Sequence, residues 1–169
     1  MHIINKLAIA AAVPALAVSV PAAAQAGGGQ MVGTVTPVCE VNDLFGTIAF
    51  DSLTAGASIS DSVNLRCNDA DGATVTLISS EGGLESDDNE DLEIEYTATL
   101  TNSAIDGGSV TLDLPLGTQG DNDASASENA SGSTAFATGV AGSLEVTLKE
   151  TAVWAGGYSD TITVQLTAS

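Results

Sequence analysis

Hydrophobic and polar residues alternate strictly along four segments of the chain. The clearest segment runs from Leu92 to Leu100, where every second residue is apolar or aromatic and Glu or Thr residues stand between them. The same alternation recurs at residues 110–116, 144–148 and 162–168. A period of two residues is typical of a β-strand with one buried face and one solvated face. We therefore expect each segment to be a half-buried strand.

Weaker strand patterns occupy residues 33–41, 46–50, 61–67 and 73–79. Glycine-containing turn signals such as Asp71-Gly72 separate the segments, and no helical period follows residue 26. About seven or eight short strands with one-sided alternation predict an all-β fold, an Ig-like antiparallel β-sandwich. A closed barrel is the alternative.

Two segments lack any apolar period. Residues 81–91 are rich in Asp and Glu, and residues 119–133 are rich in Asp, Asn, Ser, Ala and Gly. Segments of this composition have too little apolar surface to bury. Both are predicted to be exposed, mobile loops.

The N-terminus has the three regions of a secretory signal peptide. A short start containing Lys6 precedes an apolar run from Leu7 to Pro21, and small residues then lead to a cleavage site after Ala26. The apolar run is shorter than the roughly 20 residues that a membrane-spanning helix needs, which disfavours a membrane anchor. We therefore expect residues 1–26 to be a signal peptide. Residues 27–169 would form a single exported domain that does not insert into a membrane.

Two cysteines, Cys39 and Cys67, both lie on the apolar phase of predicted strands. In an exported chain with two cysteines, a disulfide is the expected state. Two free buried thiols are the alternative, and a redox pair is disfavoured because the Cys-x-x-Cys spacing is absent. The sequence predicts one bridge that joins two strands of the sandwich.

The charge balance is strongly acidic, with a formal net charge of −19. Nucleic acid and anionic membrane surfaces would repel such a chain. The one histidine, His2, lies in the predicted signal peptide, so the mature chain lacks histidine for general acid–base or triad chemistry. Some acidic pair would lie at a glycosidase spacing by chance, but Trp154 is the single Trp and offers no extended sugar platform. We expect no enzymatic activity and no bound cofactor.

Calcium is the metal that these acidic side chains could bind. It takes six to eight oxygen ligands, and Asp87, Asp88, Glu90 and Asp91 are clustered carboxylates. The cluster lacks the alternating ligand spacing and central glycine of an EF-hand loop. A solvated loop is therefore favoured, and these four residues are weak calcium candidates. Acidity suited to a saline habitat or to solubility explains the same composition.

Several short motifs now stand in order along the chain. Cys39-Glu40-Val41 is followed by Leu44-Phe45-Gly46-Thr47, then by Val63-Asn64-Leu65-Arg66-Cys67, and the chain closes with Gly156-Gly157-Tyr158-Ser159-Asp160-Thr161 before the last strand. In this order the chain resembles the spore coat protein U family, the pilin-like domains of archaic chaperone–usher systems. The resemblance covers most of residues 27–169. A looser resemblance, to small exported β-rich proteins with a Phe-Gly-Thr-Ile motif, leaves the cysteine pair unexplained.

The resemblance implies an Ig-like sandwich that is incomplete because its final strand is missing. A periplasmic chaperone and then a neighbouring subunit would fill the gap by strand addition, with an usher as the assembly partner. Ile162, Val164 and Leu166 would line the donor-strand groove. Met31, Val32 and Val35 would belong to the donor segment, which is short. The protein would pass through the periplasm to the cell surface or an extracellular fibre.

A second hypothesis is a self-sufficient secreted binding module, in which calcium could act at residues 81–91. The first hypothesis, a structural or adhesive subunit, predicts dependence on a partner strand. The second predicts a stable monomer, with a melting temperature that calcium raises if the acidic segment is a site.

Overall fold

The computed structural model describes residues 29–44, 46–115 and 124–169. The predicted signal peptide, residues 1–26, lies outside them. Two units are distinguished, Met1–Thr34 and Val35–Ser169, and every described helix and strand belongs to the second. No helix among the described residues is long and apolar enough to span a membrane.

The second unit is built almost entirely of antiparallel strands, as the sequence predicts. Its elements are β1 (Cys39–Asn42), β2 (Ser58–Cys67), β3 (Ala73–Ser79), β4 (Leu84–Ser86), β5 (Asn89–Ile94), β6 (Tyr96–Asn102), β7 (Ser109–Asp113), β8 (Ala124–Ala130), α1 (Thr134–Thr138), β9 (Val140–Leu148), β10 (Tyr158–Ser159) and β11 (Ile162–Ala168).

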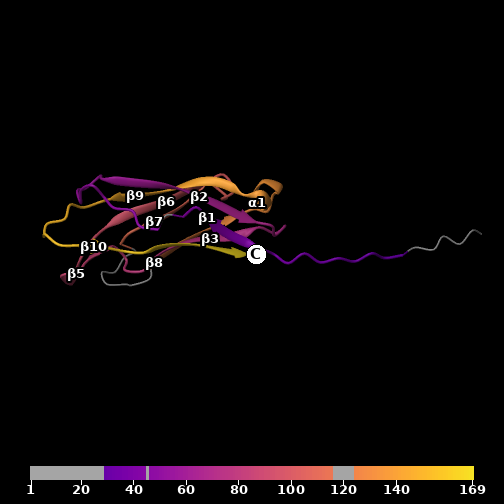
Figure 1. Cartoon of the computed structure of the whole chain (residues 1–169), viewed down its shortest axis with the longest axis horizontal. Coiled ribbons are helices and arrows are strands. Elements are labelled where there is room, and N and C mark those ends of the chain that lie inside the picture. The colour runs from indigo at the N-terminus through magenta and orange to yellow at the C-terminus, as the bar shows by residue number, and fades with distance from the viewer. Residues whose placement is uncertain (1–28, 45, 116–123) are drawn as a thin grey trace, which may run out of the picture. The chain divides into compact units, whose positions relative to one another are not determined.

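The strands form open sheets rather than a closed barrel. One sheet has the order β1-β2-β9-β6-β7, the second has the order β11-β3-β8, and a small third sheet has the order β10-β4-β5. Figure 1 shows β9, β6 and β2 in one layer and β3 and β8 in the layer facing it. In Ig-like terms, β1, β2, β9 and β6 correspond to strands A, B, E and D, and β3 and β11 to strands C and F. The described residues contain no strand G beside β11.

The core lies between the apolar faces of the two larger sheets. Val75 and Leu77 of β3 and Ala98 and Leu100 of β6, in the other sheet, are buried in the same apolar cluster. Aliphatic side chains dominate this core, and Tyr96 and Phe136 are its fully buried aromatic residues among those described. The period-two pattern of the sequence is therefore the pattern of burial, because alternate side chains of a strand point to opposite faces.

The prediction of one strand from Leu92 to Leu100 is wrong at Glu95. β5 ends at Ile94 and pairs with β4, whereas β6 begins at Tyr96 and pairs with β7 and β9. Ile94 and Tyr96 are both buried, so the alternation continues through the break while the chain passes from one sheet to another.

The prediction of an exposed loop at residues 81–91 is also wrong, because β4 and the first half of β5 form a hairpin there. Leu84 pairs with Ile94, and Tyr158 of β10 pairs with Ser86. Ser86 is buried at 5% exposure. Pairing on both sides of β4 supplies backbone hydrogen bonds that the acidic composition does not reveal.

The second predicted loop, residues 119–133, contains strand β8. Residues 124–130 pair along the whole of β3, and Ala124 and Ala130 are buried. Residues 119–123 lie outside the described part of the chain. Small alanine side chains fill the space beneath this edge strand, so burial occurs without the large apolar residues that a sequence pattern detects.

Two further expectations also fail. Residues 46–50 form no strand. The short helix α1 forms where no helical period was found, because Ser133 caps it by accepting the Phe136 backbone N–H at 3.1 Å and Gly139, at φ 112°, ends it. Phe136 is fully buried, so a tertiary contact holds this helix.

Candidate functional site

The free edge of β11 is the first component of the candidate site. β11 pairs with β3 over its whole length, and among the described residues no strand pairs with its other edge. Its exposed residues are Thr163, Gln165, Thr167 and Ala168, all uncharged. Proteins commonly protect exposed edges with charged side chains. In a chain with a net charge of −19, this edge lacks that protection.

The other sheet edges, apart from the two-residue strand β10, carry acidic residues. Glu40 lies on β1, Glu93 on β5, Asp113 on β7 and Glu128 on β8. Like charges on two edges would oppose their pairing. Among the edge strands longer than two residues, the uncharged β11 is therefore the one best suited to accept another strand.

An apolar hollow of about 390 Å³ adjoins the N-terminal end of β11. Residues of the segment before β2 line it, together with Tyr158 and Ile162. Large apolar side chains in this hollow are only half-buried; among them are Ile48, Phe50, Leu53, Ile59 and Leu84. All of them except Ile48 pack against the core, and all present surface to solvent. The hollow can therefore take up further apolar side chains.

The three predicted groove residues occupy different positions along β11. Ile162 lines the hollow, Val164 is buried at 7% exposure, and Leu166 is half-buried against the core. The structure thus places their side chains on the apolar face of a strand that is paired on one edge and free on the other. Their role beneath a donated strand stays a prediction.

The predicted donor segment is exposed. Met31 is 98% exposed, and Val32 and Val35 are each 84% exposed, with no strand assigned to residues 29–38. Met31 and Val32 belong to the first unit and Val35 to the second. Three large apolar side chains in solvent are unusual for a chain with few exposed apolar residues, and their donor role stays a prediction.

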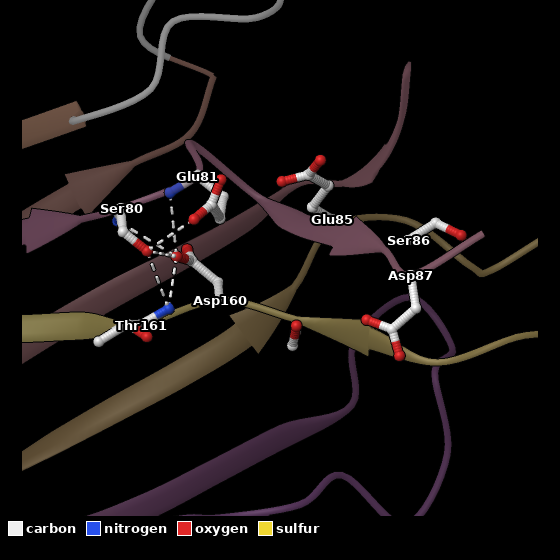
Figure 2. A pocket seen from close by; sticks show the side chains of 8 residues that line it. Ser80, Glu81, Glu85, Ser86, Asp87, Asp160 and Thr161 are labelled. Carbon is white, nitrogen blue, oxygen red and sulfur yellow. Dashed lines mark hydrogen bonds between the residues drawn. The ribbon is translucent and has the colours of Figure 1, made fainter. Parts of the chain in front are cut away.

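Asp160 lines the apolar hollow and organises the surrounding backbone. Its Oδ2 accepts hydrogen bonds from the Ser79 hydroxyl and the Tyr96 hydroxyl, each at 2.6 Å. Its Oδ1 accepts the backbone N–H groups of Ser80, Glu81 and Thr161, and the Ser80 hydroxyl at 3.0 Å. Figure 2 shows the donors of Ser80, Glu81 and Thr161 converging on the carboxylate from the chain just after β3 and just before β11.

This network connects three parts of the fold. Ser79 ends β3, Asp160 lies between β10 and β11, and Tyr96 begins β6 in the other large sheet. A carboxylate can accept several hydrogen bonds at once, and bonds to a charged group are stronger than neutral ones. Sequence reasoning did not identify Asp160 as a site residue. The signal that could have identified it is the Asp-Thr pair at the start of an otherwise uncharged strand.

The hydroxyl of Tyr96 is buried against that carboxylate. Burial raises the pKa of Tyr96 above its ordinary value, and the negative charge of Asp160 and its hydrogen bond raise it further. The folded protein therefore keeps this proton at pH values where the unfolded chain, with a phenol pKa of about 10, has released it.

We expect the free energy of unfolding to fall at high pH because of Tyr96. The stabilisation that comes from the raised pKa of Tyr96 is fully present below about pH 10. Above that pH it is lost by up to about 1.4 kcal/mol per pH unit. Urea denaturation of the wild type and of Tyr96→Phe, at intervals of about half a pH unit from roughly pH 8 to pH 11, measures this loss of stability. The difference between the two proteins should shrink above pH 10; a constant difference would contradict the prediction.

A second, polar hollow of about 290 Å³ contains one of the predicted calcium candidates. Asp87 lines it together with Glu81, Glu85 and Asp160. Figure 2 shows the Asp87 and Asp160 carboxylates at opposite ends, with Glu85 between them. Asp88 does not line this hollow, and the side chains of Glu90 and Asp91 lie outside the described set. No group of three or more His, Cys, Asp or Glu side chains in the described part of the chain could hold a metal ion.

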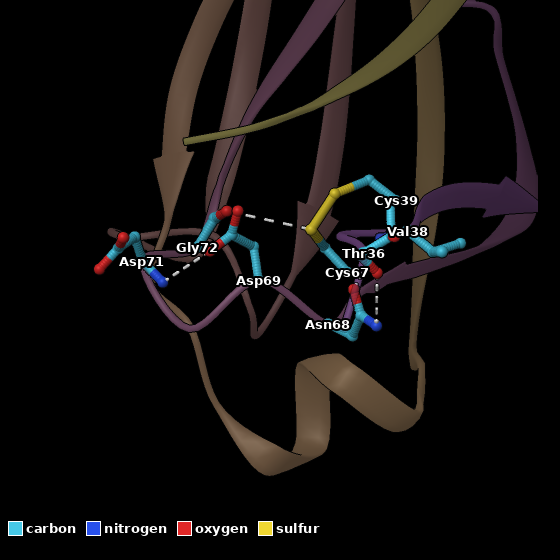
Figure 3. Close-up of a disulfide and its surroundings, with 8 residues drawn as sticks. All are labelled: Thr36, Val38, Cys39, Cys67, Asn68, Asp69, Asp71 and Gly72. Carbon is cyan, nitrogen blue, oxygen red and sulfur yellow. Dashed lines mark hydrogen bonds between the residues drawn. A yellow bond between two sulfur atoms is a disulfide. The ribbon is translucent and has the colours of Figure 1, made fainter. Parts of the chain in front are cut away.

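The predicted disulfide is confirmed. Cys39 and Cys67 are bonded, and they are direct partners in the antiparallel pairing of β1 with β2. Figure 3 shows the bridge beside Asn68, whose side chain accepts the Val38 backbone N–H at 2.6 Å. The bridge and Asn68 together hold the chain that enters β1 against the end of β2. They fix one end of the sandwich edge where β1 lies beside β11.

Comparisons with known proteins give one match among solved structures, and no family model and no curated protein matches the chain. The match is a complex of the chaperone CsuC with the tip adhesion subunit CsuE, from archaic chaperone–usher Csu pili of Acinetobacter baumannii. It has a TM-score of 0.36 and 16% sequence identity, and it covers 79% of this chain. The chain spans 40% of the length of the matched chain. A likeness at this level carries no argument about function.

Proposed function

We propose that this protein is an exported structural or adhesive surface subunit, assembled by donor-strand exchange in a chaperone–usher-type pathway. The observation that carries the proposal is the unpaired, uncharged edge of β11 next to an apolar hollow. Its role is non-catalytic, and its site of action is the cell surface or an extracellular fibre.

Strand addition at this edge is favourable for two physical reasons. The backbone N–H and C=O groups along the free edge of β11 would gain partners from an added strand. Alternate side chains of that strand would enter the hollow beside Ile162, and burial stabilises by about 25 cal/mol per Å² of apolar surface removed from water. Backbone pairing supplies strength, and the fit of the buried side chains supplies specificity.

The donor in a fibre is a second copy of this chain, through the segment that holds Met31, Val32 and Val35. Residues 27–38 contain no charged side chain, so this segment can approach β11 without the repulsion that two acidic domains otherwise exert. Its exposed apolar side chains are the kind that the hollow would bury. Before assembly, a strand of a periplasmic chaperone would hold the same place, and an usher would mediate the exchange.

Electrophoresis of material sheared from the surface of the cells that make this protein tests the proposal. Boiled and unboiled samples are separated in SDS and probed with an antibody to residues 35–169. A ladder of multimers that collapses to monomer on boiling is expected. Monomer in both lanes, together with a folded protein in solution, would overturn the proposal and favour a self-sufficient secreted binding module.

We expect the double variant Met31→Asp/Val35→Asp to abolish the ladder without lowering the stability of the monomer. Both side chains are exposed, so the domain does not depend on them, whereas a donated strand could no longer bury them. Val153→Asp is the matched control, because Val153 is as exposed as Val35 but lies elsewhere. A ladder in the double variant would contradict the assigned donor segment.

The acceptor edge has its own pair of variants. Thr163→Asp places a charge on β11, and Ser125→Asp places one on β8, the opposite edge of the same sheet. The first should shorten or abolish the ladder, and the second should leave it unchanged. Equal effects of the two would mean that added charge, rather than the β11 edge, governs assembly.

A further inference from the structure

The chain enters the sandwich at Val38, where Asn68 holds its backbone on both sides. The Val38 backbone N–H donates to the Asn68 side-chain oxygen at 2.6 Å, and the Asn68 backbone N–H donates to the Val38 carbonyl at 3.2 Å. The Asn68 side-chain amide also donates to the Thr36 carbonyl at 3.5 Å. Figure 3 shows Asn68 next to these residues and to the Cys39–Cys67 bridge. Three hydrogen bonds therefore fasten residues 36–38 to the end of β2.

These contacts continue the register in which β1 pairs with β2. Cys39 is opposite Cys67, and one step earlier Val38 is opposite Asn68. At this step the Asn68 side chain accepts the N–H that a backbone carbonyl accepts in a regular antiparallel ladder. Among the described non-glycine residues only Asp43 has a positive φ, so residues 36–38 do not form the tight hairpin turn that needs one. The chain before Cys39 therefore runs on in line with β1 instead of turning back.

The direction of this entering chain matters because β11 ends beside the bridge, while the apolar hollow lies at its other end. The Ser169 backbone N–H donates to the Gly72 carbonyl at 3.2 Å, and that carbonyl oxygen lies 3.9 Å from Cys67 Sγ. Ile162, at the start of β11, lines the hollow. The seven residues of β11 span about 20 Å. A strand that comes from the bridge and fills the hollow has to run about that far.

The donor segment of the same copy could reach the hollow only by turning back close to Val38. Met31 is the donor residue farthest from β1, and the extended chain from Val38 to Met31 spans roughly 24 Å. With residues 36–38 fastened in line with β1, a turn can begin only on the N-terminal side of Thr36, about 10 Å beyond Cys39. The chain from Thr36 to Met31 spans roughly 17 Å, and most of it would be used in returning to the level of the bridge. The fastened segment is therefore too short to fill the hollow of its own copy.

We propose that Asn68 is a positioning residue for strand exchange, which directs the donor segment to a neighbouring copy by preventing its closure on the β11 of its own copy. This inference rests on the proposed function, in which the segment that holds Met31, Val32 and Val35 is the donor. A tethered segment competes strongly for a site on its own chain, because its effective concentration is in the millimolar range. Blocking that reaction leaves the segment available to a second copy.

SDS electrophoresis of sheared material, unboiled and boiled, tests this role with Asn68→Ala as the variant. The ratio of multimers to monomer should fall by about tenfold, because two hydrogen bonds of ordinary net strength correspond to about that factor. The monomer that accumulates should be closed on its own strand, so that it migrates faster before boiling than after it. A variant that merely destabilises the domain would give no such compact band.

Two further variants separate positioning from a general loss of structure. Asn68→Asp keeps an acceptor for the Val38 N–H and removes the donor to the Thr36 carbonyl, so a fall of about threefold is expected. Asp69→Ala is the matched control, because Asp69 is the next residue in the same connection and is also half-buried. Its side chain accepts the Asp71 backbone N–H at 3.0 Å within that connection. The control should leave the ratio unchanged, and an equal fall would overturn the proposal.

The identity of the segment in the compact monomer is tested by combining variants. Met31→Asp/Val35→Asp is added to Asn68→Ala. Burying these carboxylates beside β11 is unfavourable, so the triple variant should lose the compact band. A compact band that persists would mean that another segment closes the monomer, and this would overturn the proposal.

The wild type distinguishes failure of this inference from failure of the proposed function. A wild-type ladder with an equal ladder in Asn68→Ala would overturn the inference and leave the proposed function standing. A compact wild-type monomer that unfolds on boiling would also overturn the inference, because the segment would then close on its own strand with Asn68 in place. Wild-type monomer of the same mobility in both lanes would overturn the proposed function and this inference with it.

Discussion

Replacing Asp160 with alanine is expected to lower the free energy of unfolding by about 3–4 kcal/mol. The substitution removes both oxygens that accept the hydroxyls of Ser79 and Tyr96 and the backbone N–H groups at the end of β3. Ser79 and Tyr96 are both buried at 0% exposure, so their donors would be left without partners inside the protein. An orphaned buried donor costs about 1–3 kcal/mol, more than the net value of a typical hydrogen bond.

Two milder variants identify the origin of that loss. Asp160→Asn keeps the shape and one acceptor oxygen, so about half of the loss is expected. Tyr96→Phe removes one donor together with its need for a partner, and about 1 kcal/mol is expected. Urea denaturation, read by circular dichroism, measures all three. A loss below about 1 kcal/mol in Asp160→Ala would show that the network does not hold the two sheets together.

The same variant also probes the acceptor hollow. Asp160 and Tyr96 both line it, at the end where β10 passes into β11. If Asp160→Ala loosens this end, assembly into multimers should fall along with stability. Asp160→Asn, which retains more of the network, should assemble more fully than Asp160→Ala, and the reverse order would contradict the link between the network and the hollow.

Removing the Cys39–Cys67 bridge is expected to lower the free energy of unfolding by about 3–4 kcal/mol. The sequence separation of 28 residues sets the size of the loop that the bridge closes in the unfolded chain. Without the bridge the unfolded ensemble gains entropy, and β1 is held to β2 by four paired positions and the Asn68 hydrogen bond to Val38. The double variant Cys39→Ala/Cys67→Ala, studied by urea denaturation, gives the value.

Reduction of the wild type supplies the control for that measurement. A thiol reductant should lower the stability of the wild type to about that of the double variant, and it should leave the double variant unchanged. Because the bridge fixes β1 beside β11, we also expect fewer multimers from the double variant. Equal stability of wild type and double variant would mean that β1 and Asn68 hold this end of the domain without the bridge.

Local alternation of apolar and polar residues was sufficient to predict the strands that form the core. The predicted strand at 73–79 is β3 with the same bounds, and the alternating segment at 162–168 is β11. These strands contribute large aliphatic side chains to a single apolar face, so burial imposes the same period on the sequence and on the structure. The disulfide was also predictable, because an exported chain with two cysteines on strand positions offers one pairing.

The local sequence pattern failed to predict the structure of segments whose pairing with distant residues decides their conformation. β4 and β8 have polar or small-residue sequences, yet each is a strand because a neighbour more than 40 residues away offers its backbone: β10 pairs with β4, and β3 pairs with β8. Helix α1 depends on a cap and on the burial of Phe136. Such contacts leave no periodic signal in the sequence of the element itself.

The sequence by itself determined the all-β class, the core strands, the bridge and the strong acidity of the chain. It also marked Ile162, Val164 and Leu166 as the apolar face of the last strand. Only the tertiary structure decided that β11 has an unpaired edge, that the hollow beside it is walled by residues 47–53, and that Asp160 joins both sheets. The physical reason is that side-chain alternation is a local property of one strand, whereas an open edge, a hollow and a hydrogen-bond network exist only between segments distant in the sequence.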